Sequence, residues 1–271
     1  MIKNIVKTVT VGTFLMSSFA LSAQSDVASS DTKSSASIVS TEQIINLAGQ
    51  QRMFSQRMAK DYFYVGKKIN RGNASRQLAD TLKEFKKTQI FLNKNIKDEE
   101  IRNLIAFVDM SLDEFIAISK EPYSVDNGTI ILDLSESMLE GSGYIVQAIV
   151  KDRKTNEIID TAGKQRMLSQ RIGKYYIAYQ AGIKDDNTIV QMKDTVKEFD
   201  SNLKKLMSNI SNTDKIKSEL AKVNKMWRIV YKFYLNIEKG GLPVIVYSTT
   251  DDITTKMDKI VSLYVNILEK K

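Results

Sequence analysis

The sequence predicts an all-α protein that consists of two copies of one four-helix unit, and three observations lead to this prediction. The 271 residues include only 2 prolines and 12 glycines, so little interrupts long helices. Hydrophobic side chains make up 42% of the chain, which is enough for a buried core. A stretch near residue 50 recurs 114 residues later, which indicates an internal duplication.

The duplication is visible in two separate blocks that keep one register. Ile44–Gly66 and Ile158–Gln180 are identical at twelve of 23 aligned positions. The same shift of 114 aligns Asp80–Phe85 with a later block, where five of six residues are identical. Further on, Ile145-Val146 recurs at a shift of 115, so the second copy has gained about one residue. We therefore expect each copy to fold as the same unit.

The N-terminus has the three parts of a secretory signal. Lys3 and Lys7 form a basic head, an apolar stretch follows, and small residues lead to a cleavage point after Ala23. The apolar stretch is shorter than the ~20 residues that span a bilayer, and an uncleaved anchor is the alternative. Residues 24–40 are rich in serine, alanine and aspartate and are predicted to be a flexible leader. The mature protein is expected to be periplasmic, and export argues against nucleic acid as a partner despite the net charge of +8.

Apolar residues recur at helical spacing through both copies, which we place at 41–152 and 153–271. Ser40 and Gln43 form a possible capping box for the first helix. Breaks are expected at Asp126–Gly128 in the first copy and at Gly240–Pro243 in the second. The predicted helices, which bury their stripes best as bundles, are 41–70, 75–96, 98–120, 130–152, 153–182, 188–210, 213–239 and 250–270.

The junction between the copies, Val150–Glu157, has neither glycine nor proline. The apolar stripe stays in phase across it, through Ile145, Ile149, Ile159 and Gly163. This pattern predicts two tandem four-helix bundles joined by a continuous helix. A hairpin at the junction is the alternative.

Composition excludes several kinds of site. The chain has no cysteine and no histidine, so disulfides, thiolate metal sites and the common catalytic triads are impossible. We predict no enzymatic activity, no cofactor and no metal, although an enzyme that uses paired carboxylates stays as an alternative. The acidic clusters Asp98–Glu100 and Asp251-Asp252 are interpreted as helix starts, where acids interact well with the helix dipole.

The clearest chemical signal is the block Ala48–Arg57, which recurs as Ala162–Arg171. A glycine inside a helix costs ~1 kcal/mol relative to alanine, so its repeated use indicates close approach of a helix or a ligand. The fixed fork of donors on a neighbouring arginine suits a planar oxyanion. Arg57 points to another face and has Asp61 at salt-bridge spacing. The candidate ligand-binding residues, which share one helix face in each copy, are Gly49, Arg52, Gln56, Gly163, Arg166 and Gln170.

This block resembles the signature of PilJ-type sensor domains, which occur in the type IV pilus chemoreceptor and, in variant form, in nitrate/nitrite sensor kinases of the NarX/NarQ kind. In those kinases the equivalent helix lies at a dimer interface, where arginines from two copies clamp one nitrate ion. The resemblance extends over both copies, about 230 residues, and implies that Arg52 and Arg166 bind the ligand beside Gly49 and Gly163. The residue before each arginine is a glutamine, where the nitrate sensors carry an apolar residue, so the block is closer to the pilus-receptor form.

The sequence therefore predicts an exported sensor module for a small anion, nitrate or nitrite by preference, that presents its ligand state to a membrane receptor or histidine kinase. The alternative is a ligand-free scaffold of a pilus or receptor assembly, in which Arg52 and Arg166 fix the bundle by hydrogen bonds. Copies that lie end to end would need a parallel homodimer to pair their motif helices. Copies that lie side by side would bring the two arginines together within one chain.

Overall fold

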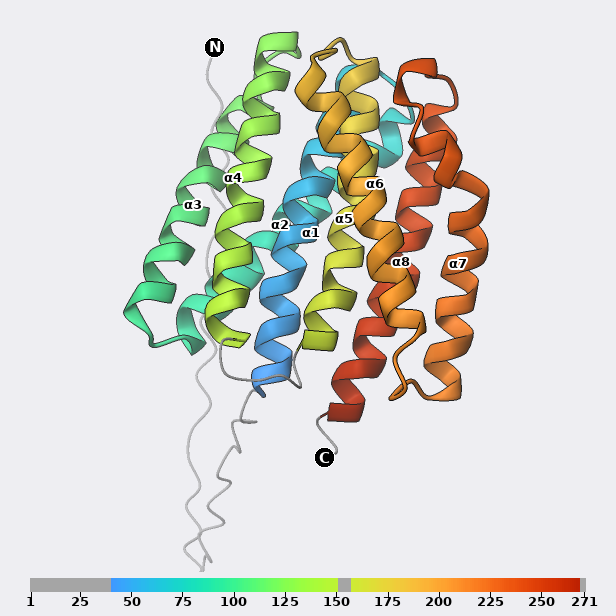
Figure 1. Ribbon diagram of the computed structural model, residues 1–271. Coiled ribbons are helices and arrows are strands. Elements are labelled where there is room, and N and C mark those ends of the chain that lie inside the picture. The colour runs from blue at the N-terminus through green and yellow to red at the C-terminus, as the bar shows by residue number, and fades with distance from the viewer. Residues whose placement is uncertain (1–39, 151–156, 269–271) are drawn as a thin grey trace, which may run out of the picture. The chain divides into compact units, whose positions relative to one another are not determined.

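Residues 40–150 and 157–268 are described here from a computed structural model (Figure 1). The predicted signal peptide and nearly all of the predicted leader lie outside these residues. The described part is helical and contains no strand, which confirms the all-α prediction. Its elements are α1 (Thr41–Gly66), α2 (Arg71–Asn95), α3 (Glu99–Ser119), α4 (Val125–Val150), α5 (Glu157–Gln180), α6 (Asp186–Met207), α7 (Asp214–Tyr234), the short 3₁₀ helix η2 (Ile237–Lys239) and α8 (Pro243–Leu268).

Helix starts follow the capping chemistry of the sequence. The backbone N–H of Gln43 donates to Ser40 Oγ at 3.1 Å, as the predicted cap requires. Asp98 Oδ1 caps α3 by accepting from the backbone N–H of Ile101 at 3.0 Å, which confirms the helix-start interpretation of that acid. These caps satisfy backbone donors that the first turn of a helix leaves free.

One expected break lies inside a helix, and the other is confirmed at residues 240–242, which separate η2 from α8. The run Asp126–Gly128 falls in the first turns of α4, where Ser124 Oγ accepts from the backbone N–H of Asn127 at 3.0 Å. Pro243 opens α8 rather than ending the preceding loop, because a proline at the first helical position loses no intrahelical hydrogen bond. Both fourth helices therefore begin earlier than the sequence predicts.

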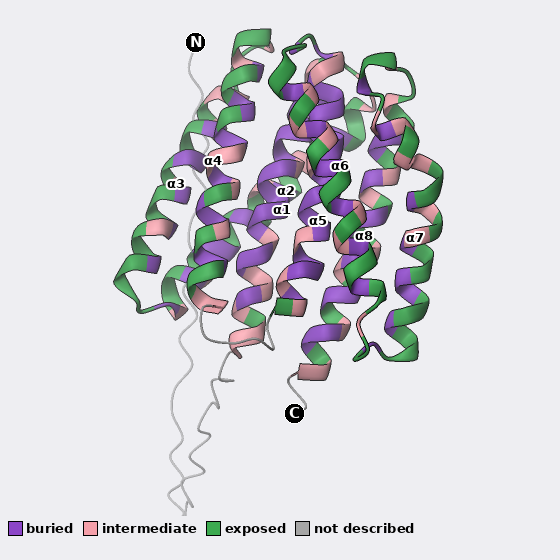
Figure 2. Cartoon of the chain, viewed as in Figure 1, coloured by how far each residue is buried: buried purple, intermediate pink, exposed green. Residues whose placement is uncertain are grey.

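The helices α1 and α5, which carry the two motif blocks, lie side by side at the centre and are buried on almost every face (Figure 2). In the first copy α2 and α4 flank α1, and α3 packs on α4. In the second copy α6 and α8 flank α5, and α7 packs on both of them. Residues 157–268 thus repeat the arrangement of residues 40–150 except at the third helix, which packs mainly on one neighbour in the first copy and on two in the second. All eight α-helices belong to one compact unit.

The directions of the helices correct the expected continuous junction helix. Arg52 pairs with Asp160 and Lys60 lies beside Gly173, so α1 and α5 run parallel and in register. Gln56 contacts Ser135 and the more C-terminal Phe63 contacts Gly128, so α4 runs antiparallel to α1. Consequently α4 and α5 run in opposite directions, as in the hairpin alternative. The stripe across the junction is in phase either way, because both helices face the same core.

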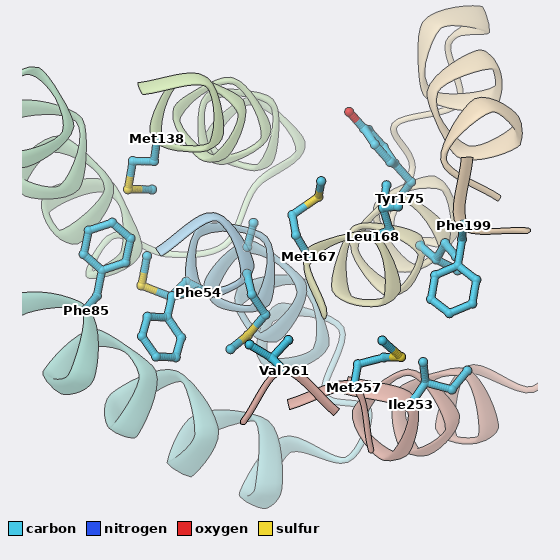
Figure 3. Packing of buried hydrophobic residues seen from close by; sticks show 14 of the residues in the cluster. Phe54, Phe85, Met138, Met167, Leu168, Tyr175, Phe199, Ile253, Met257 and Val261 are labelled. Atoms are coloured by element: carbon cyan, nitrogen blue, oxygen red, sulfur yellow. The ribbon is translucent and has the colours of Figure 1, made fainter. Parts of the chain in front are cut away.

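The apolar residues of both motif blocks lie in the core. Met53, Phe54, Met167 and Leu168 are buried, as the helical spacing predicts, and Phe54 packs against Phe85 of α2 with ring centroids 6.4 Å apart (Figure 3). Among the described helices, none combines the length and the apolar character that a bilayer crossing requires.

Candidate functional site

The structure brings Arg52 of α1 and Arg166 of α5 together at the contact between the two copies, which we call the seam. A Cβ atom placed on Gly49 would lie 3.3 Å from Arg52 Nη2 and 3.6 Å from Arg166 Nη2. A Cβ atom placed on Gly163 would lie 3.4 Å from Arg166 Nη2 and 3.5 Å from Arg52 Nη2. The two glycines therefore leave the room into which both guanidinium groups reach, as expected for side-by-side copies.

Both arginines are buried and each already has a carboxylate partner. Arg52 Nη2 donates to Asp160 Oδ1 at 2.7 Å, and Arg166 Nη1 donates to Asp258 Oδ1 at 2.6 Å. Arg166 Nη2 also donates to the backbone oxygen of Asn46 at 3.4 Å. The Nε atom of each arginine is buried and has no hydrogen-bond partner among the described residues. The seam thus holds two paired cations with part of their donor capacity unused.

Electrostatics at the seam reflect this crowding of charge. Burial lowers the pKa of the Arg166 guanidinium; Asp258 acts against that shift, and the charge of Arg52 adds to it. Burial alone would raise the pKa of Asp160, but Arg52 and Lys164 outweigh it and the net shift is downward. Asp160 is thus held as a carboxylate at neutral pH.

The two carboxylates belong to the second copy alone. Asp160 stands where the first copy has Asn46, at the shift of 114. Asp258 stands where the first copy has Gly143, at the shift of 115. A sequence search for repeated residues on the motif face therefore passes over both acids, although they complete the site.

The candidate glutamines bond to the fourth helices and not to the two arginines. Gln56 Nε2 donates to the backbone oxygen of Ser135 in α4 at 2.9 Å, and Gln170 Nε2 donates to that of Thr250 in α8 at 3.3 Å. Ser135 and Thr250 are equivalent at the shift of 115, so the two contacts are the same contact in both copies. These side chains hold the fourth helix of their own copy against the motif helix.

A second polar layer crosses between the copies next to these glutamines. Lys60 Nζ of α1 pairs with Asp251 Oδ1 of α8 at 2.6 Å, and Lys174 of α5 pairs with Glu136 of α4. Each lysine is fully buried. The two lysines are equivalent in the two copies, as are the two acids, and each lysine pairs with the acid of the other copy. The sequence contains the signal for this layer, a repeated lysine and a repeated acid, but only the fold shows that the pairs are exchanged.

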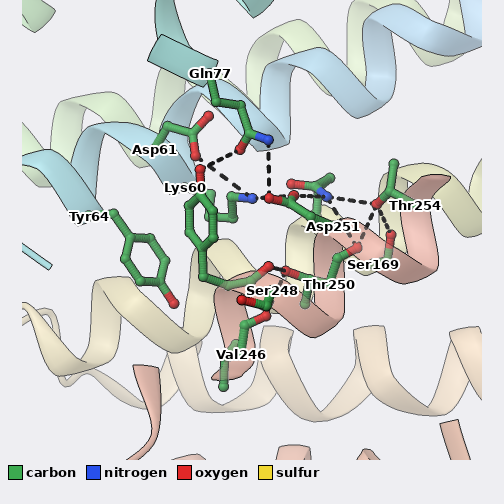
Figure 4. Close-up of polar contacts among 12 residues, drawn as sticks. Lys60, Asp61, Tyr64, Gln77, Ser169, Val246, Ser248, Thr250, Asp251 and Thr254 are labelled. Carbon is green, nitrogen blue, oxygen red and sulfur yellow. Dashed lines mark hydrogen bonds and ion pairs between the residues drawn. The ribbon is translucent and has the colours of Figure 1, made fainter. Parts of the chain in front are cut away.

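Figure 4 shows the Lys60 half of this layer. Asp251 Oδ2 also accepts from Gln77 Nε2 at 3.1 Å, and its Oδ1 accepts from Gln170 Nε2 at 2.9 Å. Asp251 thus lies in the interior of α8, which corrects its interpretation as a helix-start acid. Its pKa would rise by burial, but the charges of Lys60 and Arg57 lower it overall.

The expected pair between Arg57 and Asp61 is absent from the described contacts. Asp61 is fully buried, its carboxylate accepts no hydrogen bond there, and Lys60 Nζ lies 3.7 Å from its Oδ1 (Figure 4). The fold turns Asp61 inward, toward α8, while Arg57 stays partly exposed.

Comparison with known proteins gives one family. Residues 34–95 and 149–240 match PilJ, described as type IV pili methyl-accepting chemotaxis transducer N-term, and the two segments contain the two motif blocks. No curated protein and no solved structure matches the chain significantly.

Proposed function

The chain belongs to the PilJ family of sensor domains, and from that premise we propose that it is a sensory module that binds a small oxyanion, nitrate or nitrite by preference, at the seam. The observation that carries the proposal is the meeting of Arg52 and Arg166 beside Gly49 and Gly163. In this arrangement one chain supplies both halves of an arginine clamp.

The seam has the chemistry that a planar monoanion needs. An exposed ion pair is worth only ~0–1 kcal/mol, but two buried arginines act in a region where water competes poorly. The unpartnered Nε–H groups of Arg52 and Arg166 are donors that a bound oxyanion satisfies. Alanine at either glycine would place a methyl group in the same space.

Asp160 and Asp258 act in the proposal as internal competitors of the ligand. Each pairs with one arginine and balances its charge. The side chain of Asp258 is 49% exposed, so it can turn to solvent when an anion takes its place on Arg166. Exchange of a tethered carboxylate for a free anion is the event that would alter the contact between α1 and α5. We propose that a membrane receptor or histidine kinase reads this change.

Titration calorimetry of the mature protein with sodium nitrate and sodium nitrite tests the proposal, and we expect one anion per chain. Arg52→Ala and Arg166→Ala should each abolish the heat of binding. Gly49→Ala should weaken binding at least about tenfold without loss of stability, because alanine favours the helix by ~1 kcal/mol. Arg102→Ala, which removes an exposed arginine of α3, is the matched control and should bind as the wild type does.

A second candidate function is a ligand-free interaction module, and the carboxylate partners of the two arginines favour it. In that case Arg52 and Arg166 only tie the copies together. The arginine variants would then lower the melting temperature by leaving Asp160 or Asp258 unpaired, while no anion would bind to the wild type even at millimolar concentration. Absence of heat with both nitrate and nitrite would overturn the sensor proposal. We propose no catalytic role, because the acids at the seam are engaged by arginines.

A further inference from the structure

The groove between α6 and α7 forms a cavity of about 850 Å³, within the range of small-molecule sites. Trp227 and Tyr231 line its floor, and the cationic side chains of Lys204, Arg228 and Lys232 stand around them. This groove lies on the outer helices of the second copy and shares no residue with the seam (Figure 1).

Its floor is an aromatic cluster. The indole ring of Trp227 lies 4.2 Å from the ring of Phe199 and 5.6 Å from that of Tyr231. Trp227 Nε1 donates to Asp200 Oδ1 at 3.0 Å, and Lys204 Nζ pairs with Asp200 Oδ2 at 2.7 Å. The single acid of the groove is therefore engaged. Trp227 is only 2% exposed, so the ring surface that the groove offers to a ligand comes from the half-buried Tyr231.

Two cations of the groove are uncommitted. The side chains of Arg228 and Lys232 form no hydrogen bond and no ion pair within the described residues. They stand one helical turn apart on α7, on the side of the helix that faces the cavity. Together they give the groove an excess of positive charge above an apolar floor.

The first copy has the equivalent groove without the excess of positive charge. A shift of 115 aligns three buried residues of α3 with three buried residues of α7: Ile101, Ile105 and Val108 with Ile216, Leu220 and Val223. In this register Trp227 stands in place of Leu112, and Arg228 in place of Asp113. The groove between α2 and α3, about 340 Å³, is lined by Leu112, by the acids Asp109 and Asp113 and by one cation, Lys86. The fold therefore does not require the aromatic and cationic lining of the α6/α7 groove.

We propose that the α6/α7 groove is a second ligand site, which binds a small carboxylate that carries an aromatic ring. The ring packs on Tyr231, which itself contacts the buried Trp227, and the carboxylate pairs with Arg228 and Lys232. Arginine suits this task because its fork donates two parallel N–H bonds, one to each oxygen of a carboxylate.

The only tryptophan of the chain, Trp227, reports binding directly. We would titrate the mature protein with phenylacetate and follow intrinsic tryptophan fluorescence, with acetate and phenylacetamide as probes that lack the ring or the charge. Phenylacetate should give a saturable change, and the other two should bind at least about tenfold more weakly. The double variant Arg228→Glu with Lys232→Glu should weaken phenylacetate binding at least about tenfold, because it replaces two attractions by two repulsions.

The matched control is Lys215→Glu with Lys225→Glu, which makes the same change of net charge at exposed positions of α7 outside the groove. This control should bind phenylacetate as the wild type does, and both double variants should keep the wild-type melting temperature. No saturable response to phenylacetate would overturn the proposal. Equal weakening in both double variants would also overturn it, because the anion would then respond to net charge rather than to the groove.

Discussion

Asp61 is a carboxyl group that the fold buries completely beside Lys60, at the position where the second copy has Tyr175. Burial raises its pKa from 3.8 to about 7; Lys60 opposes the shift and Asp251 of α8 adds to it. The other groups that face it are Arg57 on its own helix and the hydroxyl of Tyr247 on α8.

The folded protein therefore holds a proton on Asp61 that the unfolded chain has already lost. Because the native state binds more protons between about pH 4 and pH 7, the free energy of unfolding falls as pH rises through this window, and the loss is complete above it. Asp61→Asn removes the buried charge. As pH rises from about 4 to about 8, the free energy of unfolding of the variant should increase by roughly 1–3 kcal/mol relative to that of the wild type.

Urea denaturation of wild type and Asp61→Asn across this pH range measures the difference. Asp80→Asn, at an exposed position of α2, serves as the control, and its free energy of unfolding should change with pH as that of the wild type does. A difference between Asp61→Asn and the wild type that stays constant with pH would contradict the assignment of the titration to Asp61.

At the scale of helices, the exchanged pairs Lys60–Asp251 and Lys174–Glu136 attach each motif helix to the other copy. Burial raises the pKa of Glu136, but the charges of Lys174 and Arg171 outweigh it and lower the pKa to about 2. Burial lowers the pKa of Lys174 to about 8, against the attraction of Glu136. The pair is thus ionised at neutral pH at the cost of desolvating both groups.

We expect Glu136→Gln to destabilise the protein by about 3 kcal/mol, because it leaves the ammonium group of Lys174 buried without a counter-charge. The double variant Glu136→Gln with Lys174→Met should recover part of that loss, since the fully buried ammonium charge is gone and only the partly exposed Arg171 still lacks its partner Glu136. Urea denaturation of the two variants at neutral pH provides the comparison. A double variant that is less stable than Glu136→Gln alone would show that the pair itself, and not the stranded charge, determines the effect.

The helices themselves were largely predictable, and the exceptions have local causes. Turn-forming residues at Asp126–Gly128 and Pro243 suggested breaks, yet Ser124 caps the first run and proline is tolerated in the first turn. The polar residues of the motif were harder to interpret from the sequence. Gln56, Gln170 and both buried lysines resemble ligand or surface groups in sequence, but in the fold they bond to neighbouring helices.

At the scale of the whole helical unit, duplication and resemblance predicted the two copies and their arginines but not how the copies are placed. An in-phase apolar stripe across the junction is compatible with a straight helix and with a hairpin. The contact of Gly49 with Arg166 decides for the side-by-side arrangement. The acids Asp160 and Asp258 were missed because they have no counterpart in the first copy.

Because α5 occupies the place next to α1, the motif helix needs no counterpart from a second chain. We expect sedimentation velocity to show a monomer with and without saturating nitrate. The parallel homodimer that an end-to-end arrangement would require should not form. A dimer that strengthens with nitrate would contradict the intrachain site and would favour pairing of motif helices between chains.

The parallel, in-register contact of α1 and α5 also changes how such a site can evolve. When a two-fold site is shared by identical chains, a single mutation changes both of its walls at once, so a carboxylate introduced beside one arginine appears beside the other as well. Here each wall is encoded separately. The position of Asn46 in the first copy is an acid, Asp160, in the second. The position of Gly143 in the first copy is likewise an acid, Asp258, in the second. The duplicated chain can therefore adjust its affinity in single steps, each felt by one arginine, and a change that would be too large when doubled becomes accessible.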